Sequence, residues 1–328
     1  MVYLFQLFIA GEVENFTQRH KDVKSFIFAL MLLKPPSLQK GDTVYILSTA
    51  KKISLEEIDF AVRTFESWGL KVIVGKSIGA EYNQFAGNDQ LRLTDFQTAL
   101  DDTDIKAVIC ARGGYGTVRM LDEINFDDFT KRPKWIVGFS DITFLHTHVS
   151  NNIGIQCLHA QMPIQFEKGT NESLETLRRE LFGEKNEYNI DTHILNRTGD
   201  TKGILIGGNL SILYSITGTK SGMNTDRKIL FLEDLDEYLY HIDRMMMNLK
   251  RSGKLQNLAG LIVGGFTDMH DNKIPYGKNA YEIILEHVNE YSYPVCFNFP
   301  AGHIEDNRAL VIGRTYTMIV HEDSVKVF

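Results

Sequence analysis

The sequence predicts an α/β protein with an N-terminal doubly wound, mostly parallel sheet domain and a C-terminal mixed β-barrel-like domain. Val44–Leu47 has the pattern of a buried strand, and Ser54-x-x-Glu57 is a capping box that begins a helix with apolar residues at helical spacing. Leu70–Val74 follows as the next strand, and such a strand–helix–strand start is typical of a parallel sheet. The all-apolar segment Ala107–Ala111 has the composition of a central parallel strand, because both faces of such a strand are buried.

The rest of the first half continues this alternation. Strands are expected over Trp135–Gly138 and Ile153–Leu158, and helices are expected over Leu91–Leu100, from Thr117 and from Asp141.

The second half is less regular, which favours a mixed, barrel-like β domain. Two helical segments, Tyr238–Leu249 and Ala280–Val288, interrupt its strands. The strand-like segments are Gly203–Gly208, Ile229–Leu232, Leu261–Phe266 and Leu310–Val320.

Composition excludes several classes of protein. With 328 residues, 43% of them hydrophobic and 23% charged, the chain has the composition of a globular protein of about two domains. Its net charge of −7 disfavours nucleic acid and anionic membranes as partners, since both need a basic surface. No apolar run approaches the roughly 18 residues of a membrane-spanning helix. Cys110, Cys157 and Cys296 are too far apart for a metal site or a disulfide framework, which favours a reducing compartment.

The predicted domains are separated by a polar segment. Residues 167–200 are rich in charge around one mixed helix near Leu174–Phe182, so we predict a linker there. It would separate an α/β domain of residues 37–166 from a β-rich domain of residues 201–328.

Residues 1–36 are predicted to be a separate N-terminal extension. Ser25–Leu33 has the apolar length of a signal-peptide core, but acidic residues precede it and no small-x-small cleavage site follows. We expect the extension to arise from an upstream start codon, with Met31 as the natural first residue. A signal or anchor is the alternative.

Ser140 is the first residue that could carry chemistry. It lies in Gly138-Phe139-Ser140-Asp141, between a predicted strand and a predicted helix, at the sheet edge where α/β folds place their sites. The segment partly resembles the G-x-S-x-G nucleophile turn, although Ile142 replaces the final glycine. A helix N-cap serine is the alternative interpretation.

A glycine-rich loop follows another predicted strand. Arg112-Gly113-Gly114-Tyr115-Gly116 would let backbone amides approach a phosphate or a developing oxyanion closely. It is neither a dinucleotide-binding nor a Walker motif, and a tight turn without a ligand is the alternative.

A carboxylate and a histidine also lie at predicted strand ends. Glu233-Asp234 follows Ile229–Leu232 and could orient a histidine, although a solvated turn is the alternative. His303 follows Gly302 at a strand exit, which suits a positioned imidazole, whereas a lone histidine is more often structural. The chain order Ser…Glu…His fits several hydrolase folds.

Seven segments together resemble the LD-carboxypeptidase family, the muramoyl-tetrapeptide carboxypeptidases, which are serine peptidases. They occur in the family's order between residue 34 and about residue 313. The segments are Lys34-Pro35-Pro36 with Lys40-Gly41-Asp42-Thr43, Phe85-Ala86-Gly87, Ala111–Gly116, Val137–Thr143, Gly207-Gly208-Asn209-Leu210, Leu232-Glu233-Asp234 with Ile242-Asp243-Arg244-Met245, and Gly302-His303.

The resemblance implies a role for each matching residue. Ser140 matches the family's nucleophile, and Glu233 and His303 match the other two members of its triad. The family's oxyanion hole implies the backbone amides of Gly114 and Asp141. The candidate substrate contacts are Arg112, Tyr115 and Asn209.

The resemblance also implies a reaction and a setting. The implied reaction is hydrolysis of the bond before the terminal D-alanine of a murein tetrapeptide, in a cytoplasmic homodimer that serves peptidoglycan recycling and needs no metal or organic cofactor. One alternative is an immunity amidase of the same family, which cleaves peptidyl-nucleotide antibiotics. A non-catalytic module that binds a phosphorylated ligand through the glycine loop is the other alternative.

Overall fold

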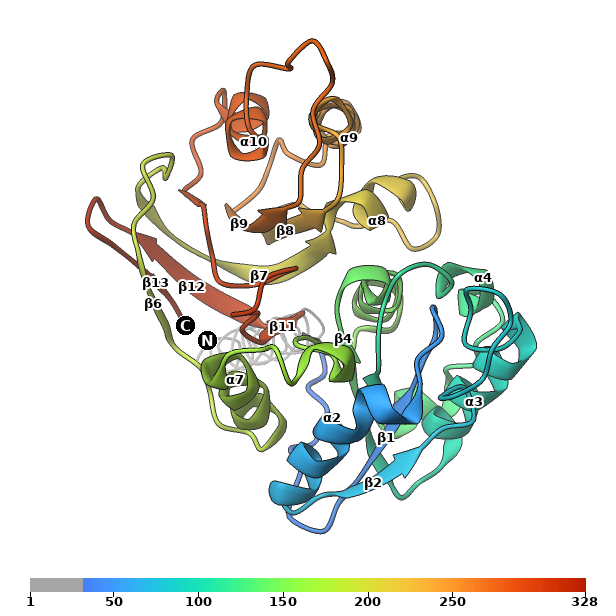
Figure 1. Cartoon of the computed structure of the whole chain (residues 1–328). Helices are drawn as coiled ribbons and strands as arrows, with labels where there is room; N and C mark the ends of the chain where they lie inside the picture. Colours follow the sequence, from blue (N-terminus) through green and yellow to red (C-terminus); the bar gives the residue numbers. More distant parts are fainter. Residues whose placement is uncertain (1–31) are drawn as a thin grey trace, which may run out of the picture.

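The computed structural model describes residues 32–328, which form two sheets with helices packed around them (Figure 1). Most of the predicted extension, and the start-codon and signal-peptide expectations with it, lies outside the described residues. Residues 32–36 of that segment contact the first sheet and the chain that leads into it. Leu33 forms a backbone bridge with Ile155, and the oxygen of Pro36 accepts a hydrogen bond from Trp135 Nε1 at 3.0 Å.

The first sheet has six strands in the order β11-β5-β4-β3-β1-β2. Strands β1 to β5 are parallel, and β11 pairs with β5 in the antiparallel sense. The bounds are β1 Thr43–Leu47, β2 Lys71–Val74, β3 Ile105–Cys110, β4 Trp135–Gly138, β5 Cys157–His159 and β11 Leu310–Ile312.

Helices cover both faces of this sheet, which confirms the doubly wound prediction. Val44 and Ile46 of β1 pack in one apolar cluster with Phe65 of α2, whereas Tyr45 and Leu47 pack on the other face. The alternation follows from the two-residue period of a strand. The helices of this part are α2 Leu55–Ser67, α3 Asp89–Asp101, α4 Val118–Leu121, α5 Asp127–Lys131, the 3₁₀ turn η1 Ser140–Ile142, α6 Thr143–His148, the π turn η2 Val149–Ile153, the 3₁₀ turn η3 Pro163–Gln165 and α7 Asn171–Leu181.

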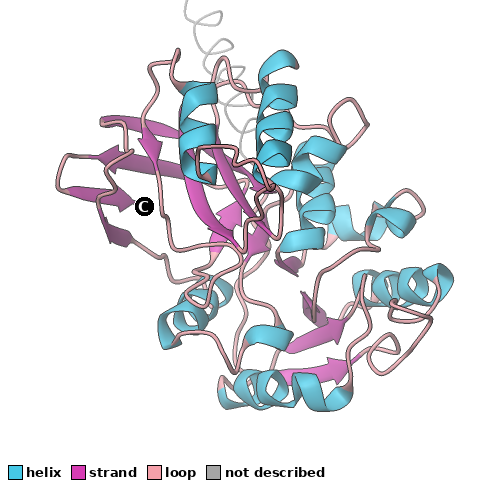
Figure 2. Ribbon diagram, turned by 45° about the horizontal axis from the view of Figure 1, so that its top comes forward, coloured by secondary structure: helices cyan, strands magenta, loops and turns pink. Residues whose placement is uncertain are grey.

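The second sheet has seven strands in the order β10-β9-β8-β7-β12-β13-β6. Strands β7 to β10 are parallel, and β12, β13 and β6 continue the sheet in antiparallel pairs (Figure 2). The strand bounds are β6 Tyr188–Asp191, β7 Gly199–Asn209, β8 Ile229–Leu235, β9 Gly260–Thr267, β10 Val295–Cys296, β12 Thr315–Val320 and β13 Ser324–Val327, and the helices are α8 Leu210–Ser215, α9 Leu239–Arg251 and α10 Ala280–Val288.

This sheet confirms the mixed β fold class that the sequence predicts. In the connection between β6 and β7, Arg197 forms a backbone bridge with Val295 of β10, which is the strand at the opposite end of the sheet from β6.

Two predicted strands differ from the observed ones. Leu310–Val320 was expected as one strand but forms β11 and β12 in different sheets, because Gly313 turns the chain between them with φ of +93°. Strand β5 begins only at Cys157 because Val149–Ile153 forms a π turn.

The division into domains of residues 37–166 and 201–328, with a linker between them, remains a prediction. The proposed linker of residues 167–200 contains α7 and β6, and β6 belongs to the second sheet. One buried apolar cluster also joins the two sheets, with Ile142 and Leu145 from the segment after β4 and Ile206 and Leu210 from β7 and α8. Across residues 32–328, none of the helices is both long and apolar enough to cross a bilayer.

A buried ion pair ties α7 to the turn between β11 and β12. Arg314 donates to both carboxylate oxygens of Glu180, with an Nη1–Oε1 distance of 2.7 Å, and the Glu180 side chain is 0% exposed. Removing one partner of such a pair leaves the other charge buried without compensation, which is far more costly than losing a surface pair.

We therefore expect Glu180→Gln to lower the free energy of unfolding in urea by about 3 kcal/mol. The matched control is Arg63→Ala, which breaks an exposed pair with Asp59 in α2 and should hardly change stability. An apolar pair, Glu180→Leu with Arg314→Met, should recover most of the loss. Equal stability of Glu180→Gln and the control would contradict this role of the pair.

Candidate active site

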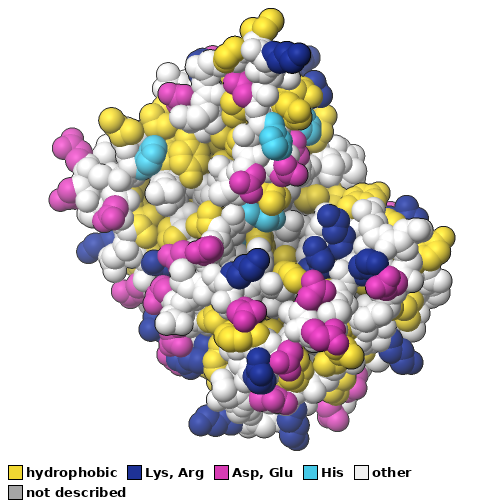
Figure 3. Space-filling view, viewed as in Figure 1, with side chains coloured by type: hydrophobic (Ala, Val, Ile, Leu, Met, Phe, Trp, Pro, Cys, Tyr) yellow, Lys and Arg dark blue, Asp and Glu magenta, His cyan; other side chains and the backbone are white. Residues whose placement is uncertain are grey.

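A cavity of about 450 Å³ lies where the first sheet meets the second. Its lining residues follow the carboxyl ends of β1, β3 and β4 on one side and of β7 and β8 on the other. Since β1 and β3 are the strands between which the order of a doubly wound sheet reverses, this is the edge where such folds bind ligands. Figure 3 shows the central hollow, with basic side chains at its lower right rim and acidic and histidine side chains above it.

Ser140 lies on a sharp turn between β4 and α6. Its backbone has φ of +62°, in the left-handed region that a residue with a side chain rarely adopts. The neighbouring loop is adapted to this turn, because a Cβ atom at Gly113 would lie 3.1 Å from Ser140 Oγ. The strained turn presents the serine hydroxyl to the cavity, as in a nucleophile turn.

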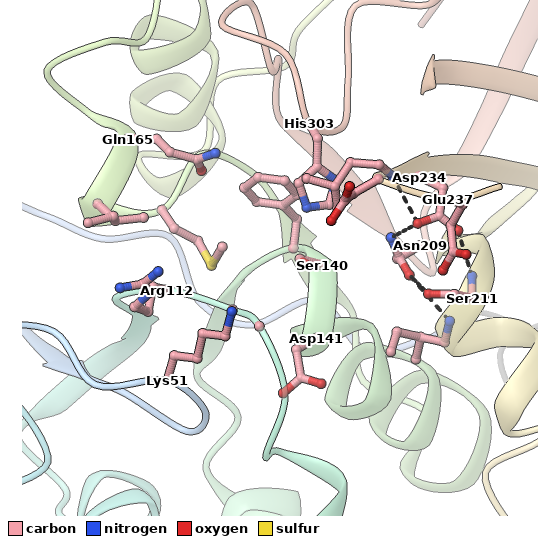
Figure 4. Close-up of a pocket in the computed structure, with 18 residues that line it drawn as sticks. Lys51, Arg112, Ser140, Asp141, Gln165, Asn209, Ser211, Asp234, Glu237 and His303 are labelled. Carbon is pink, nitrogen blue, oxygen red and sulfur yellow. Dashed lines mark hydrogen bonds between the residues drawn. The ribbon is translucent and has the colours of Figure 1, made fainter. Parts of the chain in front are cut away.

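The other two candidate catalytic side chains come from the second sheet and its connections. His303 Nδ1 lies 2.6 Å from Glu233 Oε2, and the exposed fractions are 11% for His303 and 0% for Glu233. The predicted strand end at Glu233 is therefore a buried segment of β8, and a solvated turn is wrong. Figure 4 shows the His303 ring directed from above toward Ser140.

The environment of His303 favours its charged form. Burial acts to lower the pKa of the imidazole, but the charge and hydrogen bond of Glu233, helped by the charge of Asp234, raise the pKa above its ordinary value. The ring also packs edge-on against Phe139, with 4.7 Å between ring centroids. The imidazole is therefore both oriented and made more basic.

The two predicted oxyanion donors, Gly114 and Asp141, line the same cavity as Ser140. Gly114 has φ of +111° and Asp141 directly follows the strained residue Ser140. The buried carboxylate of Asp141 accepts from the amide of Thr117 at 2.8 Å, which holds the glycine loop against the serine turn. Burial raises the pKa of this carboxyl.

The three predicted substrate contacts differ in the cavity that they line and in the hydrogen bonds that they already make. Arg112 lines the cavity and keeps most of its donors unused, with one hydrogen bond to the oxygen of Lys52 at 3.1 Å. Asn209 also lines it, but its amide caps α8 and bonds Asp234 at 2.9 Å. Tyr115 is half-exposed and lines a neighbouring cavity of about 490 Å³ instead.

Sequence reasoning missed Lys51, which lines the cavity from the end of β1. The available signal was its place four residues after the first predicted strand, in the loop at the ligand-binding edge of a parallel sheet. Asp234 has other partners than the adjacent Glu233, because it accepts hydrogen bonds from Asn209 and from the amide of Ser211 at 2.9 Å each. Burial, followed by the charge of Glu233, raises the pKa of Asp234 to about 7.

Within the part of the chain that the structure describes, no group of three or more histidine, cysteine, aspartate or glutamate side chains is arranged to hold a metal ion. The three cysteines are free and buried.

Comparisons with known proteins identify the family of this chain. Residues 44–160 match the N-terminal domain of the LD-carboxypeptidase family, and residues 202–318 match its C-terminal domain. The chain belongs to the LD-carboxypeptidase family.

Relatives extend this match over nearly the whole chain. A probable murein peptide carboxypeptidase of Bacillus subtilis (strain 168) is 34% identical over 90% of this chain and 94% of its own length. A murein tetrapeptide carboxypeptidase of Pseudomonas aeruginosa is 30% identical over 83% of this chain and 91% of its own length.

Solved structures share the fold at lower identity. Muramoyltetrapeptide carboxypeptidase from Oxalobacter formigenes has a TM-score of 0.78 and 24% identity, covering 87% of this chain and 97% of its own. A mutant of the microcin C7 self-immunity protein MccF, in complex with adenosine monophosphate, has a TM-score of 0.80 and 20% identity, covering 90% and 98%. At these identities the likeness shows the fold alone.

The contact between His303 and Glu233 predicts a titration that needs no assay of activity. We expect the His303 ring to titrate above about 6.5 in NMR spectra, and Glu233→Gln to bring its pKa below that value, because burial then dominates. His303→Gln identifies the signal. Since the folded pKa is raised, this pair stabilises the fold fully below about pH 6.5 and less as pH rises through the folded pKa. An unchanged titration in Glu233→Gln would contradict the coupling.

Proposed function

We propose that this protein is a serine LD-carboxypeptidase that releases the terminal D-alanine from murein tetrapeptides. The observation that carries the proposal is the buried Glu233–His303 hydrogen bond beside a serine held on a strained turn. A base that is itself oriented by a third group, next to a hydroxyl nucleophile, is the arrangement of serine hydrolases.

Each of the three side chains has a distinct task in the proposed mechanism. His303 Nε2 takes the proton of Ser140 as the serine oxygen attacks the carbonyl carbon of the penultimate residue. Glu233 accepts the hydrogen bond of Nδ1–H, fixes the tautomer and stabilises the imidazolium. The protonated ring then gives its proton to the departing nitrogen of D-alanine, and the C–N bond breaks.

Water completes the cycle. His303 removes a proton from a water molecule that attacks the acyl-serine, and Ser140 recovers its proton when the ester bond breaks. The amides of Gly114 and Asp141 are proposed to hold the oxyanion of both tetrahedral intermediates. Loss of one such donor costs about 3–4 kcal/mol in enzymes of this kind.

The names of the relatives and the charge of the cavity support the substrate. The two curated relatives described above are named for murein peptides, and one of them for the tetrapeptide. A carboxypeptidase has to bind a free carboxylate next to the scissile bond, and Arg112 supplies a cation in the cavity. Action in the cytoplasm, as a homodimer in peptidoglycan recycling, is part of the same proposal and rests on the family resemblance.

A second candidate is cleavage of a peptidyl-nucleotide antibiotic. The neighbouring cavity supports it, because the ring of Tyr115 is 47% exposed there and packs beside Phe85, with 6.2 Å between ring centroids. Exposed aromatic rings can stack on a nucleobase. A structural neighbour with bound adenosine monophosphate shares the fold.

Ser140→Ala should lower kcat for release of D-alanine by about 10⁴-fold or more while leaving the thermal unfolding curve unchanged. Adding His303→Ala should cost little more, because the three residues act as a unit. Ser67→Ala is the matched control, since this serine lies on α2 and only bonds the oxygen of Thr64. A Ser140→Ala enzyme within tenfold of the native rate would exclude Ser140 as the nucleophile.

Substrate choice separates the two candidate functions. A defined tetrapeptide should release D-alanine, detected by mass, whereas the pentapeptide ending in D-Ala-D-Ala should be cut poorly. The scissile carbonyl of the pentapeptide belongs to a D-centre, which would turn it away from the oxyanion donors. Equal rates on both peptides, or faster cleavage of an aminoacyl sulfamoyl-adenosine, would overturn the assignment.

A further inference from the structure

Two basic side chains line the cavity without an acidic partner in residues 32–328. Arg112 donates a single hydrogen bond, to the backbone oxygen of Lys52, and the Nζ atom of Lys51 donates none. Neither side chain forms a salt bridge with a described residue, whereas the adjacent Lys52 pairs with Glu81 at 2.7 Å. The cavity therefore contains positive charge that the protein leaves uncompensated.

The acidic side chains on the opposite wall are already bonded. Asp234 accepts three hydrogen bonds from protein donors, each at 2.9 Å. Asp236 lies 2.5 Å from a ring nitrogen of His270, and Glu237 lies 2.6 Å from one of His241. These carboxylates bond groups on their own side of the cavity, and none of them forms an ion pair with Arg112 or Lys51 among residues 32–328.

The position of Lys51 is built into the fold. Its backbone oxygen accepts a hydrogen bond from Ser48 Oγ at 2.7 Å, at the end of β1. Its methylene chain covers the glycine loop so closely that a Cβ atom at Gly114 would lie 2.6 Å from Lys51 Cδ. Figure 4 shows the ammonium group beyond this contact, directed toward the open centre between Arg112 and Ser140.

We propose that Lys51 is a specificity-determining residue that binds a carboxylate of the substrate, with Arg112 beside it. The inference rests on the proposed function, because a murein tetrapeptide provides the carboxylate. A charge-assisted hydrogen bond to an ammonium group in a partly enclosed cavity is stronger than one in water. Lys51 would thus favour peptides that carry a free carboxylate next to the bond that is cut.

Two carboxylates of the substrate have the required chemistry. One is the terminal carboxylate of D-alanine. The other belongs to the side chain of the third residue when that residue is diaminopimelate, and it is absent when the residue is lysine. The two sources can be separated by changing one group of the peptide at a time.

The test compares Lys51→Met with the native enzyme on three tetrapeptides. The first has diaminopimelate and a free terminal carboxylate, the second has the same sequence with a terminal amide, and the third has lysine in place of diaminopimelate. Lys51→Met keeps the chain that covers Gly114 and removes only the charge, whereas Lys51→Arg keeps the charge. Lys52→Met is the matched control, because its ammonium group pairs with Glu81.

We expect Lys51→Met to lower kcat/KM on the first peptide by about ten- to a hundredfold, and Lys51→Arg to retain most of the activity. If the loss vanishes on the terminal amide, the bound group is the terminal carboxylate. If it vanishes on the lysine peptide, the bound group is the side-chain carboxylate. An equal loss on all three peptides, or no loss beyond that of Lys52→Met, overturns the inference. Failure of the native enzyme to cut any of the three overturns the proposed function itself, and the inference with it.

Discussion

The pairing of β11 with β5 is the constraint on which the arrangement of the cavity depends. Leu310 pairs with His159, which in turn pairs with Gly138 at the end of β4, so a strand that follows His303 is built into the sheet that carries Ser140. The candidate nucleophile comes from one sheet and its candidate base from the connections of the other. Backbone hydrogen bonds between adjacent strands fix separation and register, so they hold the two parts of the site together more rigidly than a side-chain interface would.

The alternation of side chains along β8 gives the adjacent carboxylates Glu233 and Asp234 different roles. Successive side chains of a strand point to opposite faces, so Glu233 faces His303 while Asp234 faces Asn209 at the start of α8. Both are buried, and Glu233 bonds His303 through Oε2 alone, whereas both carboxylate oxygens of Asp234 accept hydrogen bonds, from Asn209 and Ser211. A single strand end therefore orients the imidazole and also anchors the helix that forms the wall of the cavity.

Many of the strands, and the candidate site residues at their ends, could be predicted from the sequence, because apolar strands and their end residues are local patterns. The strand before Ser140 ends at Gly138 as expected, and Ala280–Val288 was predicted with the bounds that are observed. The split of Leu310–Val320 between two sheets was not predicted, since both halves have strand-like patterns and Gly313 turns the chain between them with a positive φ. The loop after β1 was a signal for Lys51, but its contact with Gly114 joins residues far apart in the chain and could not be predicted from local patterns.

A balance between burial and charge explains why glycine precedes the candidate base. Burial alone would lower the pKa of His303, so a carboxylate has to approach the ring closely enough to reverse that effect. The backbone of Gly302 occupies the space beside Glu233, where a Cβ atom would lie 2.7 Å from Glu233 Cβ, and it adopts φ of +109°. A side chain at position 302 would clash with Glu233. The glycine therefore leaves room for the carboxylate beside the imidazole, where it can raise the pKa of the ring that faces Ser140.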